Sequence, residues 1–163
     1  MTFPTRIDYA QALEIVARIG AQHRAPPQRL AIQRVDGRVL AQAVGAEFPL
    51  PPFDNSRMDG FAVRSADLSP EAPTTLTLAG EQFAGPEAGL VLQPGQCARI
   101  TTGAPLPGGA DAVVMKERVQ VDGARVTVPA GIQAGHDIRR AGEDGQAGAQ
   151  VLDAGQVLTP ARV

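Results

Sequence analysis

The sequence has 163 residues, of which 44% are hydrophobic, and it carries a formal net charge of −2 at pH 7. A chain of this length forms one domain or two small ones, and its apolar content is sufficient for a folded core, which excludes wholesale disorder. The charge is close to neutral, Lys and Arg form no block, and aromatic residues are scarce, with five Phe, one Tyr and no Trp. These features exclude the usual nucleic-acid-binding surfaces.

Cysteine and histidine are also scarce, which narrows the possible chemistry. Cys97 is the single cysteine, and His23 and His136 are far apart in the sequence. We therefore exclude a disulfide framework, a zinc site and a histidine-dependent nucleophilic triad. No apolar run approaches the roughly 20 residues that cross a bilayer, and the N-terminus lacks the apolar core of a signal peptide. We expect a cytoplasmic protein with no membrane association.

The first segment is predicted to be helical. Thr5 and Asp8 form a weak capping-box-like start, and the apolar residues that follow, including Leu13 and Val16, lie on one stripe of a helix over residues 6–19. Such a stripe is typical of core or interface packing. Residues 30–35 then resemble a short strand, and residues 36–43 fit a short helix capped by Asp36.

From Phe48 onwards the pattern changes to short β segments between Gly- and Pro-containing turns. This pattern predicts strands over residues 61–63, 74–78, 98–101, 112–115 and 125–128, and Asp122-Gly123 predicts a hairpin turn. Residues 89–100 and 147–160 each resemble a separate strand–turn–strand hairpin. We predict an α+β fold, mostly β, with a helix/sheet unit over residues 1–46 plus 145–163 and an inserted β-barrel-like module over residues 47–144.

The first of three polar clusters runs from Asp54 to Gly60, between Pro51-Pro52-Phe53 and an apolar strand. A loop that is braced at both ends holds its side chains at low entropic cost, as a binding site requires. The carboxylates of Asp54 and Asp59 can ligate a hard cation such as Mg²⁺. Asp59-Gly60 is equally consistent with a simple turn.

The second cluster, Thr101 to Pro105, offers hydroxyl and backbone N–H groups that can bind an oxyanion, although it lacks the pattern of a P-loop. It is also consistent with an ordinary turn at the end of a strand. Lys116 and Glu117, farther along, are expected to face solvent.

The third cluster runs from Asp137 to Asp144 and contains the adjacent arginines Arg139 and Arg140. Guanidinium groups suit phosphate or carboxylate recognition. Glu143 and Asp144 are close enough in sequence to neutralise them in a solvated ion network, which is the alternative reading. Together the three clusters indicate a site for an anionic ligand, with or without a bridging metal.

Three segments carry a more specific signal. PPFDNSRMDGFAVR (residues 51–64), RITTGAPLPGGADAVVMKE (residues 99–117) and IRRAGEDGQAG with VLDAGQVLTPA (residues 138–148 and 151–161) follow one another in order. They resemble the three signatures of the MoeA family, to which the E domain of gephyrin belongs, and the resemblance spans nearly the whole chain. Two departures are mild: Arg57 stands where a small residue is commoner, and Phe61 where Tyr is.

The resemblance implies the N-terminal region, domains I and II, of a molybdopterin molybdenumtransferase. Such enzymes insert molybdate into adenylylated molybdopterin during molybdenum cofactor biosynthesis, require a divalent cation such as Mg²⁺, and form elongated homodimers. A molybdopterin adenylyltransferase is the further partner that this chemistry implies. By the same resemblance, Asp59, Thr102 and Asp144 are the expected catalytic residues, with Asp59 and Asp144 at the metal. The expected substrate-binding residues are Asp54, Asn55, Ser56, Arg139 and Arg140, with a role as inter-domain struts as the alternative for the two arginines.

The family's nucleotide-binding α/β domain and C-terminal β-barrel have no counterpart in this sequence. Since the family's active cleft lies between that α/β domain and the β-rich domain of the other subunit, we expect the isolated chain to be inactive. Two functions follow as alternatives. One is the β-rich half of a molybdenum insertase, and the other is a non-catalytic dimerisation, scaffold or partner-binding module of the same family.

Overall fold

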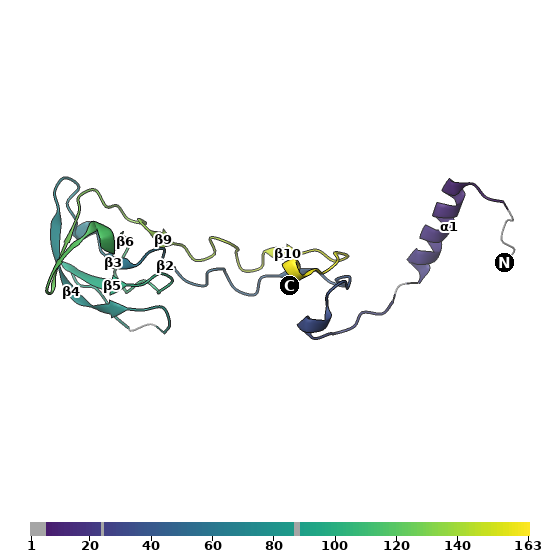
Figure 1. The fold of residues 1–163 in the computed structure, drawn as a ribbon, viewed down its shortest axis with the longest axis horizontal. Helices are drawn as coiled ribbons and strands as arrows, with labels where there is room; N and C mark the ends of the chain where they lie inside the picture. The colour runs from purple at the N-terminus through teal and green to yellow at the C-terminus, as the bar shows by residue number, and fades with distance from the viewer. Residues whose placement is uncertain (1–5, 24, 87–88) are drawn as a thin grey trace. The chain divides into compact units, whose positions relative to one another are not determined.

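A computed structural model describes residues 6–23, 25–86 and 89–163. It divides into two compact units, one made of the residues up to Ala43 together with Asp153–Val163, and one made of Val44–Leu152 (Figure 1). Over these described residues the fold is mostly β with one α-helix, which confirms the predicted α+β class. No helix within the described ranges is long and apolar enough to cross a membrane.

The first unit contains the single long helix α1, Tyr9–Gln22. It begins three residues later than predicted because Asp8 is the N-cap, accepting a hydrogen bond from the backbone N–H of Gln11 at 2.8 Å. Thr5, the other half of the predicted start, lies outside the described residues. The helix also extends beyond its predicted end at residue 19 and closes at the C-cap His23.

The predictions for residues 30–43 were wrong. Ile32–Arg34 forms a short 3₁₀ turn in place of a strand, and residues 36–43 form no helix. Val39 instead makes an antiparallel bridge to Val157, and the N–H of Leu40 donates to the carbonyl of Gln156 at 2.8 Å. A partner more than a hundred residues away therefore supplies the hydrogen bonds that a local helix would have supplied.

The second unit is built on a curled six-stranded sheet in the order β6-β3-β5-β4-β8-β7 (Figure 1). The β4–β5 pair is parallel, and the other pairs are antiparallel. These strands are β3 Gly60–Val63, β4 Thr74–Gln82, β5 Gln96–Ile100, β6 Ala112–Met115, β7 Gln120–Asp122 and β8 Arg125–Val128. The predicted strands at 112–115 and 125–128 are matched at both ends, and Gly123, at φ 57°, forms the predicted β7–β8 hairpin turn.

The part of this sheet that contains β3 and β6 is covered on both faces. One face carries a cluster that includes Val63, Leu76, Val114 and Val126, and the other carries Ala62, Ile100, Val113 and Ile138. Successive residues of β3 and β6 therefore point into different clusters, as the two-residue period of a strand requires. Burial of both faces explains why these strands are continuously apolar. Short 3₁₀ turns follow β3 and β6, at Ser65–Asp67 and Lys116–Arg118, and a further one closes the chain at Pro160–Arg162.

Two small ladders complete the second unit. Strand β2, Asn55–Ser56, pairs with β9, Ile138–Arg139, and β1, Val44–Gly45, pairs with β10, Gln150–Leu152. Between them, Leu50 and Gly145 form a further antiparallel bridge. The two predicted local hairpins are absent from this arrangement: Val91 bridges Gly108, while β10 pairs with β1 and Val157 with Val39. In each case the segment pairs with a partner outside the predicted hairpin.

Candidate functional site

The three polar clusters meet at one end of the sheet in the β-rich unit. Asp59 directly precedes β3, and Thr102 follows β5, which is the antiparallel neighbour of β3. The pairing of Gly60 with Ile100 brings the start of β3 next to the end of β5. The backbone N–H and the hydroxyl of Thr102 both donate to Oδ1 of Asp59, at 2.9 and 3.0 Å. Two donors on one oxygen fix the orientation of a carboxylate that is still 49% exposed.

Strand β6 supplies a third group from the other side of β3. Lys116 follows directly on β6, its backbone N–H donates to the carbonyl of Asp59 at 3.1 Å, and its Nζ lies 3.4 Å from Oδ2 of Asp59. This approach depends on Gly60, because a Cβ there would lie 2.0 Å from the carbonyl oxygen of Val114. The glycine of the MDG sequence thus permits the close contact of β3 and β6 that places Lys116 beside Asp59.

The first and second clusters are joined by backbone hydrogen bonds. The N–H of Gly103 donates to the carbonyl of Ser56 at 2.8 Å, and the N–H of Ser56 donates to the carbonyl of Ala104 at 3.0 Å. Gly103 adopts φ 79°, a conformation that favours glycine. The side chain of Ser56 is buried and donates to the carbonyl of Met58 at 2.6 Å. The loop that carries Asp59 is therefore held by its own hydrogen bonds and by the neighbouring turn.

The third cluster is connected to the first through β2 and β9 and through Asp54. One oxygen of Asp54 accepts the backbone N–H of Ala141 at 2.8 Å, and the other lies 2.5 Å from Nη1 of Arg140. Asp54 and Arg140 thus bind each other and fix the loop after β9. Asn55 is buried, with its Nδ2 donating to the carbonyl of Phe53 at 3.4 Å.

Two further ion pairs lie between the same loops. Arg57 contacts Oε1 of Glu143 through Nη2 at 2.5 Å and donates from Nε to the carbonyl of Ile138 at 3.0 Å. Arg139 pairs with Asp144. The acids of the third cluster therefore pair with arginines, as the alternative interpretation of a solvated ion network predicted. Asp144 pairs within its own cluster, whereas Glu143 pairs with Arg57 of the first cluster. Because these side chains are a third to a half exposed, the pairs add little to stability and mainly define positions.

Hydrogen bonding lowers the pKa of three acids in this region. The backbone N–H of Thr102, then its hydroxyl and the ammonium of Lys116, hold the pKa of Asp59 below its ordinary value of 3.8. The backbone N–H of Ala141, followed by the Arg140 guanidinium, lowers the pKa of Asp54 in the same way. The backbone N–H of Arg140 and the Arg57 guanidinium lower the pKa of Glu143 below 4.5. All three are carboxylates at neutral pH.

Two open cavities lie over these residues. The larger, of about 440 Å³, is lined by the polar loops of all three clusters: Asn55, Ser56, Arg57, Met58, Thr102, Gly103, Arg139, Glu143 and Asp144. The smaller, of about 230 Å³, is lined by Met58, Asp59, Thr102, Met115, Lys116 and Glu117. Thr102 and Met58 border both. Asp59 and Asp144, the two predicted metal ligands, border different cavities.

The described residues do not form a complete metal site. No group of three or more His, Cys, Asp or Glu side chains within those residues is placed to hold an ion. Asp59 offers only Oδ2, which faces Lys116, and Asp144 is paired with Arg139. Mg²⁺ commonly uses one or two carboxylates together with substrate phosphates and water, so these two acids can at most contribute part of such a site.

The structure also places residues that sequence reasoning missed. Lys116 was expected only to face solvent, yet it contacts Asp59, and Arg57 was noted only as a departure from the family signature. Arg57 and Glu143 are 86 positions apart, and Asp59 and Lys116 are 57 apart. The sequence held one indication of the position of Lys116. This residue directly follows the predicted strand 112–115, and the strand that pairs with it in the structure, β3, begins directly after Asp59.

Comparison with known proteins identifies the family. The family described as the MoeA N-terminal region, domains I and II, matches residues 7–163. The chain belongs to the MoeA family. Its sequence is 38% identical over 158 residues to the molybdopterin molybdenumtransferase of Synechococcus elongatus, covering 94% of this chain and 39% of that protein. It is 43% identical over 138 residues to molybdopterin molybdenumtransferase 2 of Mycobacterium tuberculosis, covering 83% and 34%.

The MoeA fold is supported by solved structures as well. The molybdopterin biosynthesis MoeA protein of Pyrococcus horikoshii superposes with a TM-score of 0.81 at 30% identity, covering 92% of this chain and 40% of that one. The resemblance inferred from the three signatures is thereby confirmed. This chain spans about two fifths of the length of such MoeA relatives, and it corresponds to their N-terminal region.

Proposed function

We propose that this chain forms the β-rich part of a molybdenum insertase, which transfers molybdate into adenylylated molybdopterin. The observation that carries the proposal is the Asp59–Thr102 pair: a half-exposed carboxylate on the smaller cavity, held by two hydrogen bonds from a threonine that borders both cavities. An acid fixed in this way is ready to orient a ligand without reorganising. The names of the relatives support molybdopterin and molybdenum as the substrates.

The site residues then take distinct roles in the proposal. Asp59 orients the molybdate or the cation that accompanies it, and Thr102 holds Asp59 in place. Arg139, on the larger cavity with Asn55 and Ser56, contacts the anionic part of the pterin substrate, and Asp144 on the same cavity helps to orient the molybdate or the cation. Asp54 and Arg140 act indirectly, since their hydrogen bonds position the loop that carries Arg139.

In this proposal a divalent cation binds together with the substrate, because the described residues alone do not form a complete metal site. Oδ2 of Asp59 and the carboxylate of Asp144 are the oxygens that this chain offers to Mg²⁺, with phosphate oxygens and water as the remaining ligands. When bound, Mg²⁺ offsets charge on the phosphates. The chain's own contribution is to hold Asp59 ionised and oriented.

The test is metal insertion by the full-length protein carrying Asp59→Asn or Asp144→Asn. We expect turnover to fall by at least about a hundredfold in each, the loss typical of a group that orients or stabilises charge at a reacting centre. Glu81→Gln is the matched control, because Glu81 is a similarly exposed acid in an ion pair with Arg99, at 3.3 Å. Turnover in the Asp59 variant equal to that of the Glu81 variant would refute the assignment.

A second candidate function rests on α1. All of its residues are described and none is buried, and Leu13, Val16 and Ile19 expose 59, 68 and 43% of their surface. An apolar helix face of this kind favours an assembly role: homodimerisation, or docking of a partner such as a molybdopterin adenylyltransferase. Sedimentation equilibrium of the chain, with Val16→Glu as comparison, would test self-association. A monomer in both cases that captures no adenylyltransferase would count against this role.

The domain boundaries are proposed as predicted, with residues 47–144 as the inserted module and residues 1–46 plus 145–163 as the helix/sheet unit. Limited proteolysis that first cleaves inside residues 60–130 would contradict them.

A further inference from the structure

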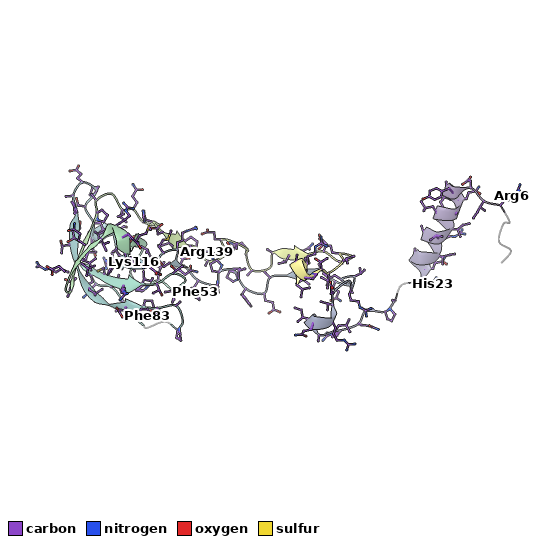
Figure 2. The ribbon with its side chains drawn as sticks, in the orientation of Figure 1. Arg6, His23, Phe53, Phe83, Lys116 and Arg139 are labelled. Carbon is purple, nitrogen blue, oxygen red and sulfur yellow. The ribbon has the colours of Figure 1, made fainter. Side chains whose placement is uncertain are left out.

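Lys116 is the only lysine of the sequence, since the other 14 of its 15 basic residues are arginines. The two side chains differ in ways that matter for binding. Arginine presents a planar fork, whereas lysine presents a compact ammonium with three rotatable donors on a flexible stem. Lys116, labelled in Figure 2, carries the one side-chain ammonium of this chain, and that ammonium lies beside Asp59.

The backbone fixes where Lys116 begins and leaves its ammonium free to move. Strand register pairs Gly60 with Met115, and the N–H of Lys116 donates to the carbonyl of Asp59 at 3.1 Å. The side chain then extends over the smaller cavity, which it lines with Asp59, Thr102 and Glu117. A tight backbone contact thus places an exposed ammonium at the edge of the candidate site.

The contact between Lys116 and Asp59 is weak enough to exchange. Nζ and Oδ2 are 3.4 Å apart, and the side chains are 57 and 49% exposed. Exposed ion pairs of this kind contribute little to stability. Oδ1 of Asp59 is already satisfied by Thr102, so departure of the ammonium uncovers Oδ2 alone and leaves the carboxylate oriented.

We propose that Lys116 is a ligand-contacting residue that leaves Asp59 to bind a tetrahedral oxyanion, either molybdate or a phosphate group of the substrate. This inference rests on the proposed function. It gives a ligand-binding role to Lys116, a residue that the sequence analysis expected only to face solvent. The exchange couples two events, because the ammonium that moves to the oxyanion frees Oδ2 for the accompanying cation. Since Asp59 and Glu117 both border this cavity, their charges repel a bare oxyanion, and binding should be stronger with Mg²⁺ present.

A single lysine makes the inference directly measurable. Reductive methylation of the full 163-residue chain with ¹³C-formaldehyde labels only Lys116 and the N-terminal amine and preserves the positive charge. The Lys116 signal is assigned by its loss in Lys116→Gln. Sodium molybdate and inorganic phosphate are titrated separately, each with and without Mg²⁺, and the Thr102 amide is followed in parallel by ¹⁵N NMR on unmethylated protein.

We expect a saturable shift of the Lys116 signal, larger with Mg²⁺, and the more effective of the two anions identifies the source of the oxyanion. Affinity read at the Thr102 amide should fall about tenfold in Lys116→Gln, the loss expected for one charge-assisted hydrogen bond. It should be unchanged in Arg99→Gln, whose partner Glu81 lies 3.3 Å away with matching exposure. No shift with either anion, or equal affinity in wild type and Lys116→Gln, overturns the inference.

The outcome separates this inference from the proposed function. If full-length Asp59→Asn is inactive while the Lys116 signal ignores both anions, the insertase proposal stands and the role of Lys116 is refuted. If the Lys116 signal shifts while full-length Asp59→Asn retains normal turnover, the chain has an oxyanion contact and the assignment of Asp59 is refuted.

Discussion

Gly60→Ala is the substitution whose effect the structure determines most sharply. A Cβ at this position would lie 2.0 Å from the carbonyl oxygen of Val114, 2.8 Å from its carbonyl carbon and 3.0 Å from Cα of Met115. All three are backbone atoms of β6, so no side-chain rotation can relieve the overlap. Relief requires β3 and β6 to separate at the end that carries Asp59 and Lys116.

The magnitude follows from the two consequences of that separation. Overpacking a well-packed site costs about 1–3 kcal/mol, and each ladder hydrogen bond lost adds about 1 kcal/mol. With one ladder hydrogen bond lost, we therefore expect a loss of about 2–4 kcal/mol in the free energy of unfolding, measured by urea titration followed by circular dichroism. Gly145→Ala is the matched control in the same unit, because a Cβ there meets no atom within 4 Å among the described residues and φ is not positive. It should change stability by less than about 0.5 kcal/mol.

Equal stability of the two variants would refute the reasoning. It would mean that β3 and β6 are not as close at Gly60 as the structure places them, and the contact between Asp59 and Lys116 would lose its basis.

Three further predictions concern the same unit. Val126→Ala should destabilise it by about 2–3 kcal/mol in urea titration, because Val126 is fully buried, whereas Val121→Ala, at the exposed cross-strand neighbour, should cost well under 1 kcal/mol. Asp54→Asn should make the melting temperature fall less steeply as the pH is lowered through the acid range. The hydrogen bonds of Asp54 lower its pKa in the folded state, so the stabilisation that its carboxylate provides is present above pH 3.8 and is lost as the pH falls through the folded pKa. A variant as acid-sensitive as the wild type would contradict that. Cys97 is buried, which raises its pKa to about 11, so iodoacetamide at pH 7.5 should modify it only in urea; rapid alkylation of the native chain, seen by mass spectrometry, would disprove the burial.

The strands of the sheet were predictable where local chemistry decided them. Residues 112–115 form a short apolar run that is buried on both faces, whereas residues 125–128 alternate polar and apolar side chains and are buried on one face; both patterns are local strand signals. Residues 36–43 and 147–160 were mispredicted because their hydrogen bonds are completed by segments far along the chain, β1 with β10 and Val39 with Val157. Local propensity carries no information about such partners.

The candidate site shows the same division. Motif and resemblance identified Asp59, Thr102 and the Arg139-Arg140 pair as site residues. They did not predict which acid pairs with which basic side chain. Asp54 with Arg140, Arg57 with Glu143 and Lys116 with Asp59 are contacts across 57 to 86 positions that only the folded sheet brings together. Each depends on the β2–β9 or β3–β6 register, and register is a tertiary property.

The central claim is that Asp59 and Thr102 act as one unit, and a double-mutant cycle on metal insertion by the full-length protein tests it most directly. Thr102→Val removes the hydroxyl that donates to Oδ1 of Asp59 and keeps the backbone donor. We expect Thr102→Val to lower turnover in the wild-type background and to have no further effect in Asp59→Asn, because Thr102 acts through the carboxylate. If Thr102→Val reduces turnover by the same factor in both backgrounds, the two residues act independently and the proposed site is wrong.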